Sequence, residues 1–267
     1  MSLRQAGYTI DAVIARSRGA SLKKAQRLAK EIGTRALVGS RKGLKVDLYW
    51  FCVPDSEIAH AAGALAEQVS WKGKIALHSS GAVTSDELAA LRARGAVVAS
   101  VHPLMTFVRG SQPSLARVPF AVEGDTPAVR AARHIVRGLG GNVYSIRKED
   151  KPAYHAWGTF ASPLFTALLA TTEQVAVLAG VNRKAARQRM IPILLQTLAN
   201  YAALDAAGAF SGPIIRGDLD TVRRHLRVLR AVPAAREVYA ALARAALRYL
   251  PAKRRNALRK LLGSRTS

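Results

Sequence analysis

The sequence predicts an α/β fold with an open, mostly parallel sheet, followed by an all-helical domain. Short apolar runs alternate with amphipathic runs over residues 1–148, which is typical of a parallel sheet covered by helices on both faces. From residue 149 to residue 267 the helical pattern continues without a convincing strand. Hydrophobic residues make up 49% of the chain, so each predicted domain can bury a core.

Apolar runs bounded by turn residues predict the strands, at 9–15, 36–38, 48–53, 74–78, 97–101, 120–123 and 142–146. Amphipathic spacing predicts the helices between them, at 20–32, 55–69, 85–94 and 126–139. Glycines and prolines delimit the helices of the second domain, at 152–179, 183–207, 218–229, 233–250 and 252–262. The apolar stretch 160–180 is interrupted by Pro163 and Glu173, so we expect a buried helix and no membrane span.

Composition narrows the class of protein. The formal net charge of +24 attracts anions, but the arginines are scattered over helix faces, so we expect a solvated surface and no specific nucleic-acid binding. Cys52 is the single cysteine, which excludes a disulfide framework and a multi-cysteine metal site. The N-terminal residues lack the apolar run of a signal peptide. We therefore expect a cytoplasmic protein without a bound metal.

Polar residues follow two neighbouring strands of the predicted sheet. His78-Ser79-Ser80-Gly81 follows the strand at 74–78, and His102-Pro103 follows the strand at 97–101, with Thr106 close behind. Ligands bind at the carboxyl ends of the strands in open parallel sheets. His102 is held extended by the proline after it. His78 is equally well explained as a buried histidine of the core.

Several motifs occur in a characteristic order: Val53-Pro54-Asp55, His78-Ser79-Ser80-Gly81, Ser100-Val101-His102-Pro103-Leu104, Tyr154-His155-Ala156 and Gly212-Pro213-Ile214-Ile215-Arg216-Gly217-Asp218. With them the chain resembles, over nearly its whole length, an uncharacterised bacterial family with a Rossmann-like NADP-binding domain and a helical C-terminal domain of unknown function. That family is similar to pyrroline-5-carboxylate reductase, ketopantoate reductase and the β-hydroxyacid dehydrogenases. The resemblance implies an NADP-dependent oxidoreductase that acts on a small carbonyl or imine acid, with a helical domain that forms a homodimer.

The sequence departs from that family at its start. A dinucleotide-binding fold opens with a strand and a glycine-rich turn that holds the pyrophosphate, and no G-x-G-x-x-G motif occurs here. Residues 2–7 resemble the end of the first helix. The sheet is therefore predicted to lack its first strand, which leaves the flanking strands roughly 9.5 Å apart. Either the second strand shifts to pair with the fourth, or an apolar slot stays open. We expect upstream codons to supply the strand, rather than a natural site without it.

Candidate cofactor-binding residues lie at three strand ends. Arg16, Ser17 and Arg18 follow the second expected strand, where an arginine accommodates the 2′-phosphate of NADP and an acidic residue would favour NAD. No acidic residue is present, so we expect NADP rather than NAD; the alternative is a basic surface turn. The resemblance implies that Val53, Pro54 and Asp55 lie along the ribose and nicotinamide, although Asp55 also suits a helix cap. Ser79, Ser80 and Gly81 are then expected near the nicotinamide amide.

Candidate catalytic residues lie on the first helix of the second domain. His155 and Thr159 share one helix face, where the β-hydroxyacid dehydrogenases have a lysine and an asparagine. His155 is therefore the candidate general acid, because an imidazole transfers protons near neutral pH. Lys151 at the helix start is a second candidate. The alternative is a polar helix face without a catalytic role.

The remaining candidates concern the substrate. The resemblance implies that the loop with His102 and Thr106 contacts substrate, and Thr159 lies on the face of His155. Arg216 can hold a substrate carboxylate, although the surrounding segment is also typical of a turn before a helix capped by Asp218. A different class of function is also open at this point. The missing glycine turn and the charge of +24 are compatible with a non-catalytic Rossmann-like protein that binds an anionic ligand or partner.

Overall fold

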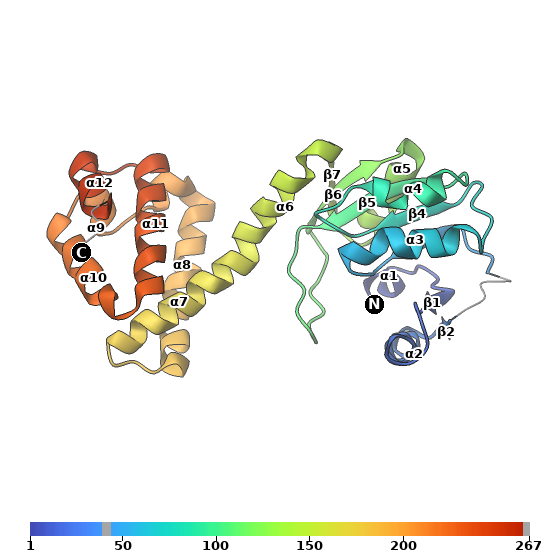
Figure 1. The fold of residues 1–267 in the computed structure, drawn as a ribbon, viewed down its shortest axis with the longest axis horizontal. Helices are drawn as coiled ribbons and strands as arrows, with labels where there is room; N and C mark the ends of the chain where they lie inside the picture. Colours follow the sequence, from blue (N-terminus) through green and yellow to red (C-terminus); the bar gives the residue numbers. More distant parts are fainter. Residues whose placement is uncertain (39–43, 264–267) are drawn as a thin grey trace. The chain divides into compact units, whose positions relative to one another are not determined.

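The computed structural model describes residues 1–38 and 44–263, and the chain divides into two compact units, Met1–Ser162 and Pro163–Ser267 (Figure 1). The first unit contains all the described strands, and the described part of the second unit is helical. The predicted fold class, a mostly parallel α/β sheet followed by a helical region, is therefore confirmed.

The first two strands form a small parallel sheet of their own. β1 (Ala12–Ile14) pairs with β2 (Arg35–Leu37), and α2 (Ala20–Ile32) connects them. The strand predicted at 9–15 is shorter than expected. The carbonyls of Ile10 and Asp11 accept hydrogen bonds from the Thr34 hydroxyl at 2.7 Å each, where the prediction placed a strand ladder.

The other strands form a five-stranded sheet in chain order: β3 (Leu48–Phe51), β4 (Ile75–His78), β5 (Val97–Pro103), β6 (Pro119–Gly124) and β7 (Asn142–Ser145). Neighbouring strands are parallel except for β5 and β6, which are antiparallel. The carboxyl ends of β3, β4 and β5 therefore lie at one edge of the sheet, and the residues that follow them share that edge.

Helices cover both faces of this sheet. α3 (Ile58–Ala66) and α4 (Ala89–Arg92) share a core with Ala76 and Val98, and α5 (Thr126–Gly138) shares the other core with Leu77 and Ala99. The strand register explains which residues share a core. Ala76 lies beside Val98, and Leu77 lies beside Ala99. Successive side chains of a strand point to opposite faces, so the two pairs belong to opposite faces of the sheet. Short 3₁₀ turns precede α3 and α4, at Asp55–Glu57 and Ser85–Leu88.

The two sheets do not join in the part of the chain that the structure describes. β1 and β3 belong to separate sheets, so of the two alternatives for the missing first strand, the shift of the second strand onto the fourth is excluded. Side chains on the N-terminal side contact both cores of the larger sheet: Ile14 packs against the core below α3, and Leu3 and Tyr8 pack against the core below α5. α1 (Ser2–Gln5) is a helix of four residues. Among the described residues, β1 and β3 each have one edge without a hydrogen-bonded neighbour strand, and we call these two edges together the β1–β3 seam.

The helical segment after β7 starts in the first unit. A 3₁₀ turn at Lys148–Asp150 leads into α6 (Lys151–Thr159), followed by a wider π-helical turn, η4, at Phe160–Leu164. Pro163 lies inside this turn. Proline has no backbone N–H and its ring collides with the carbonyl four residues earlier, so a wider turn relieves the strain.

The second unit consists of helices around its own core. They are α7 (Phe165–Leu178), α8 (Arg183–Ala209), α9 (Pro213–Arg216), α10 (Leu219–Val228), η5 (Leu229–Ala231), α11 (Pro233–Tyr249) and α12 (Arg255–Gly263). Val222, Leu247 and Leu258 are fully or almost fully buried in this core. Asp218 caps α10, as predicted, by accepting a hydrogen bond from the Thr221 backbone N–H at 3.0 Å.

The prediction of a buried helix at 160–180 is wrong, because no residue of α7 is buried within the chain. The surrounding stretch, Lys148–Leu178, is the one helical stretch of residues 1–38 and 44–263 that is long and apolar enough to cross a membrane. Length and composition alone do not assign it to a membrane. A helix whose apolar side chains pack against a partner subunit has the same length and apolar composition.

Candidate active site

His78 ends β4 and is part of the core. Its side chain has no exposed surface, its Nδ1 accepts a hydrogen bond from the Ser80 backbone N–H at 3.1 Å, and its Nε2 donates to the Thr84 carbonyl at 3.0 Å. Burial, and then the positive charge of Lys151, lower the pKa of His78 to about 4. Both ring nitrogens are satisfied, so of the two interpretations of His78 the structure favours the buried core histidine.

His102 ends β5 and forms a different kind of contact. Its Nδ1 lies 2.7 Å from the Tyr154 hydroxyl of α6, and the two rings meet edge to face with centroids 5.4 Å apart. Burial, and then the charges of Lys151 and His155, lower the pKa of His102 to about 4. Burial also raises the pKa of Tyr154, and Tyr144 adds to that effect. The imidazole and the phenol are therefore both neutral at neutral pH.

Gly81 makes room for the His102 ring. A Cβ atom at Gly81 would lie 2.8 Å from Cε1 and Nε2 of His102. Any side chain there would displace the imidazole, because real Cβ atoms do not approach that closely. The predicted turn after β4 and the predicted histidine after β5 are thus in direct contact.

Lys151, predicted as a second general acid, is almost fully buried, with 1% of its surface exposed. Its ammonium donates hydrogen bonds to the Ser80 carbonyl at 3.0 Å and the Ser100 hydroxyl at 2.5 Å. The Glu123 carboxylate lies 3.7 Å away. Burial lowers the pKa of Lys151, and the negative charge of Glu123 opposes that effect.

Two members of this cluster, Glu123 and Ser100, are not among the predicted site residues. Glu123, near the end of β6, accepts hydrogen bonds from the backbone N–H and the hydroxyl of Ser85, at 2.7 and 2.8 Å. Ser100 lies in the apolar strand β5 and donates from its hydroxyl to the Ser80 carbonyl at 3.0 Å. The sequence did contain a signal for Glu123, because it is a carboxylate inside the apolar run Pro119–Gly124. A charged residue is buried in a strand only when it has partners.

The predicted 2′-phosphate residues lie in the turn between β1 and α2. Arg16, Ser17 and Arg18 are all exposed there, and Gly19, with φ of 81°, precedes the first residue of α2. Arg16 forms an ion pair with Glu57 of the turn after β3, with 2.6 Å between Nη1 and Oε2. Ser17 and Arg18 are exposed to solvent beside this ion pair.

The residues predicted near the ribose and nicotinamide follow β3 and β4. Val53 is half-buried, and Pro54 and Asp55 are exposed at the start of the 3₁₀ turn. The Ser79 hydroxyl accepts a hydrogen bond from the Trp50 indole at 2.8 Å, so its own proton is free for another acceptor.

Ser80 differs from Ser79 because it is buried. Its hydroxyl accepts from the backbone N–H groups of Ala82 and Val83 at 3.1 Å each, and its carbonyl is bound by Lys151. Its contacts are thus those of a residue that shapes the turn.

The other predicted residues are more scattered. Thr106 is exposed in the loop after β5, and His155 is exposed on α6 one residue after Tyr154. The Thr159 hydroxyl donates to the His155 carbonyl at 2.9 Å within the helix. Arg216 lies in the second unit, exposed at the end of α9. Hydrogen bonds of Lys151 and Tyr154 place the start of α6 against β5, at the sheet edge where His102 lies.

Two groups of side chains have the chemistry to hold the ends of a nicotinamide dinucleotide. Ser17 and Arg18 suit the phosphorylated ribose, and Ser79 with the turn at Gly81 suits the amide of the nicotinamide. Residues 1–38 and 44–263 contain no glycine-rich turn that would hold the pyrophosphate. Nor do these residues contain a group of three or more His, Cys, Asp or Glu side chains that could hold a metal.

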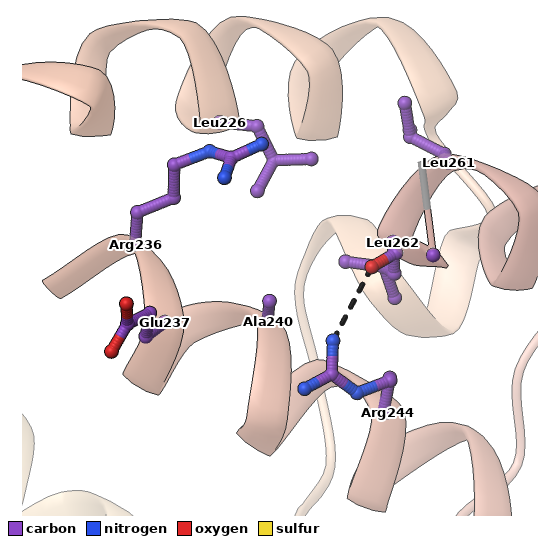
Figure 2. A pocket seen from close by; sticks show the side chains of 8 residues that line it. Leu226, Arg236, Glu237, Ala240, Arg244, Leu261 and Leu262 are labelled. Carbon is purple, nitrogen blue, oxygen red and sulfur yellow. Dashed lines mark hydrogen bonds between the residues drawn. The ribbon is translucent and has the colours of Figure 1, made fainter. Parts of the chain in front are cut away.

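The second unit has a cavity of about 300 Å³ (Figure 2), lined by Leu226, Arg236, Glu237, Ala240, Arg244, Leu261, Leu262 and Gly263. Arg244 donates to the Leu262 carbonyl at 3.3 Å across one end of it. None of the residues predicted for the site lines this cavity.

Comparisons with known proteins agree with the architecture. Residues 1–103 match the model of a Rossmann-like domain, and residues 118–246 match that of a domain of unknown function, DUF2520. Comparison with curated protein sequences finds no match.

Solved structures share the fold at low sequence identity. A Bacteroides fragilis protein assigned as an NADP oxidoreductase is 20% identical with a TM-score of 0.74, over 91% of this chain and 90% of that one. Pyrroline-5-carboxylate reductase from Coxiella burnetii is 17% identical with a TM-score of 0.56, over 99% and 93%. An imine reductase from a Pseudomonas species is 20% identical with a TM-score of 0.58, over 92% and 87%. The chain therefore combines a Rossmann-like domain with a DUF2520 domain, and it has the fold of these oxidoreductases.

Proposed function

We propose that the protein is an NADP-dependent oxidoreductase that reduces a small carbonyl or imine acid. The observation that carries the proposal is the neutral His102–Tyr154 pair at the carboxyl edge of the sheet, in contact with the turn at Gly81. Ligands bind at this edge in folds of this type. The similarity to pyrroline-5-carboxylate reductase and imine reductase structures supports the choice of reaction class.

The cofactor supplies hydride, and the residues of the chain hold it and the substrate. Ser17 and Arg18 bind the 2′-phosphate, because a guanidinium and a hydroxyl suit a phosphate better than a ribose hydroxyl. The turn from Val53 to Asp55 would contact the ribose and nicotinamide. Ser79 donates its free hydroxyl proton to the nicotinamide amide.

Proton transfer is assigned to α6. His155 is exposed, so it can give a proton to the substrate oxygen or nitrogen as hydride arrives. His102 and Tyr154 hold each other at 2.7 Å, which orients the imidazole for a hydrogen bond to the substrate. Thr106, Thr159 and Arg216 remain predicted substrate contacts.

Cofactor binding is tested by titrating the protein with NADPH and with NADH while following intrinsic fluorescence. We expect tighter binding of NADPH, and we expect Arg18→Glu to remove the preference. Arg27→Glu, on the exposed face of α2, is the matched control with the same charge change. Absence of NADPH binding at millimolar concentration would overturn the proposal.

The proton donor is tested by two substitutions on α6. We expect His155→Ala to lower kcat by about 10²–10⁴-fold with little change in NADPH affinity. Tyr154→Phe removes the hydroxyl bonded to His102 and should raise KM more than it lowers kcat, since the pair orients substrate. The assays use 2-keto acids and cyclic imines with NADPH. An unchanged rate for His155→Ala would remove His155 from the acid role.

We also propose that the second unit forms a homodimer through α8. This helix leaves six large apolar side chains 45–67% exposed: Ile191, Ile193, Leu195, Leu198, Tyr201 and Leu204. Exposed apolar surfaces of this extent mark interaction sites. We expect Leu198→Glu to yield a monomer by sedimentation, and Arg230→Glu, an exposed site on η5, to leave the dimer intact. A wild-type protein that stays monomeric at all concentrations would contradict this assignment.

A non-catalytic role has one specific observation in its favour, which is the lack of a pyrophosphate-binding turn in the described residues. In that case the edge binds an anionic ligand without turnover. NADPH binding with no reduction of any tested carbonyl or imine would favour this second candidate.

A further inference from the structure

Strand β5 and helix α6 meet through two matched pairs of side chains. Ser100 and His102 are two residues apart on β5, so they point to the same face of the strand. Lys151 and Tyr154 are three residues apart on α6, so they lie on the same face of the helix. Lys151 binds Ser100 at 2.5 Å and Tyr154 binds His102 at 2.7 Å. We call these four residues the β5–α6 contact.

The buried half of this contact cannot take part directly in the reaction. Lys151 is 1% exposed, and its ammonium is held by the Ser80 carbonyl, the Ser100 hydroxyl and the Glu123 carboxylate. A proton donor must come within hydrogen-bond distance of the substrate, and a group enclosed on all sides does not. Lys151 is therefore not the general acid, although the sequence made it a candidate for that role.

Burying an ammonium and a carboxylate together is costly in free energy, and an apolar pair of the same size is often as stable. In this protein the Lys151–Glu123 pair has an electrostatic effect on the neighbouring site. Lys151 places a positive charge below the sheet edge where His102 and the turn at Gly81 lie, and positive charge disfavours a second positive charge on an imidazole nearby.

We propose that Lys151 is a positioning residue, whose buried charge and hydrogen bonds to β4 and β5 hold the His102–Tyr154 pair in place and neutral. This inference rests on the proposed function, in which His102 orients the substrate. A neutral imidazole has one nitrogen lone pair, which accepts the Tyr154 hydroxyl proton, and one N–H. An imidazolium has two N–H groups and no acceptor for that proton.

The charged and titratable groups around His102 come from two elements besides β5. From α6, Lys151 and His155 both lower the pKa of His102. Tyr154 is also on α6 and stays uncharged, because burial raises its pKa. From the 3₁₀ turn after β3, Asp55 acts in the opposite direction. Together these influences bring the pKa of His102 to about 4; burial contributes most, and the charge of Lys151 comes next.

The experiment follows the pH titration of His102 by NMR in protein with ¹³C-labelled histidine, assigned with a His102→Gln variant. Lys151→Met alone would strand the Glu123 carboxylate, so the test variant is Lys151→Met combined with Glu123→Gln. We expect the pKa of His102 to rise by half a unit or more in this variant. Lys72→Met removes an exposed lysine of the same unit and should leave the titration unchanged.

A second variant separates charge from hydrogen bonding and serves if the double variant does not fold. Ser100→Ala removes the hydroxyl between Lys151 and the Ser80 carbonyl but keeps both charges. We expect His102 to titrate in this variant as in the wild type. A shift as large as that expected for the double variant would overturn the electrostatic role.

Activity gives an independent readout. In the active enzyme the acid limb of the kcat profile should move to higher pH in the double variant, in parallel with the His102 titration. Equal His102 titrations in wild type and double variant, or wild-type titration near pH 6.5, would overturn the inference. The NMR measurement needs neither cofactor nor substrate, so a failure of NADPH to reduce any tested substrate would overturn the proposed function and leave the NMR result interpretable.

Discussion

Two histidines at neighbouring strand ends differ in what their rings contact. His78 has both ring nitrogens hydrogen bonded within the turn that follows it, whereas His102 reaches across to Tyr154 of another element. Burial lowers the pKa of each to about 4. The pKa therefore does not distinguish the core residue His78 from the site residue His102. Their hydrogen-bond partners do.

The low pKa of His78 makes stability depend on pH. The folded state has a pKa of about 4 and the unfolded chain an ordinary value of 6.5, so the unfolded chain takes up the proton first as the pH falls. The contribution is complete above pH 6.5 and is lost as the pH falls to 4, by about 3 kcal/mol.

This loss is measured by urea unfolding followed by tryptophan fluorescence, because Trp50, Trp71 and Trp157 all lie in the first unit. His78→Asn, which keeps an acceptor for the Ser80 N–H, should show a flatter pH dependence between pH 7 and pH 4. An equally steep dependence in this variant would place the titrating group elsewhere.

Gly81 tests the close approach of the turn to His102. A methyl group there would lie 2.8 Å from the imidazole, so Gly81→Ala should displace the ring and destabilise the first unit by about 1–3 kcal/mol. Gly63→Ala in α3 is the matched control, because its Cβ meets nothing within 4 Å and alanine favours helix. Equal stabilities of the two variants in urea would contradict the steric argument.

At the scale of elements, the junction between β6 and α5 depends on two consecutive residues. Gly124 has φ of 135°, and a Cβ there would lie 2.4 Å from the Val98 carbonyl. Asp125 follows, and its carboxylate accepts from the Val98 N–H at 2.8 Å and from Arg92 at 3.1 Å. The junction thereby satisfies a backbone donor of β5 at the point where the antiparallel pairing with β6 ends.

We expect Asp125→Ala to destabilise the first unit by about 1–3 kcal/mol, because the Val98 N–H loses its partner in a half-buried place. Asp220→Ala removes an exposed carboxylate paired with Arg223 and should change stability by less than about 0.5 kcal/mol. Chemical unfolding of the two variants provides the comparison. Equal effects would show that water replaces the Asp125 carboxylate.

The strands were predictable from the sequence because central strands are buried on both faces and form continuous apolar runs, as Leu77 and Val98 illustrate. The placement of His102 at the sheet edge was predictable for the same reason. The pairing of Lys151 with Glu123 was not, because it depends on how α6 packs against β6, and no local pattern specifies that. The exposure of α7 was also missed, because apolar composition does not say which surface covers it.

At the scale of the whole molecule, the two compact units should unfold separately. Each has its own core, and all tryptophans lie in the first unit. We expect the fluorescence transition in urea to differ in midpoint from the circular-dichroism transition at 222 nm, which follows the helices of both units. Asp218→Ala removes the cap of α10 and should move only the second transition. A single shared midpoint that both Asp125→Ala and Asp218→Ala shift would contradict separate unfolding.

The β1–β3 seam has a consequence for how the protein behaves at high concentration. Within residues 1–38 and 44–263 these two strand edges are unpaired, and an unpaired edge is a template onto which an extended chain can add by backbone hydrogen bonds. Self-association of this protein is therefore expected to involve these edges. The net charge of +24 opposes such assembly by repulsion between molecules, so added salt, which screens that repulsion, should promote precipitation.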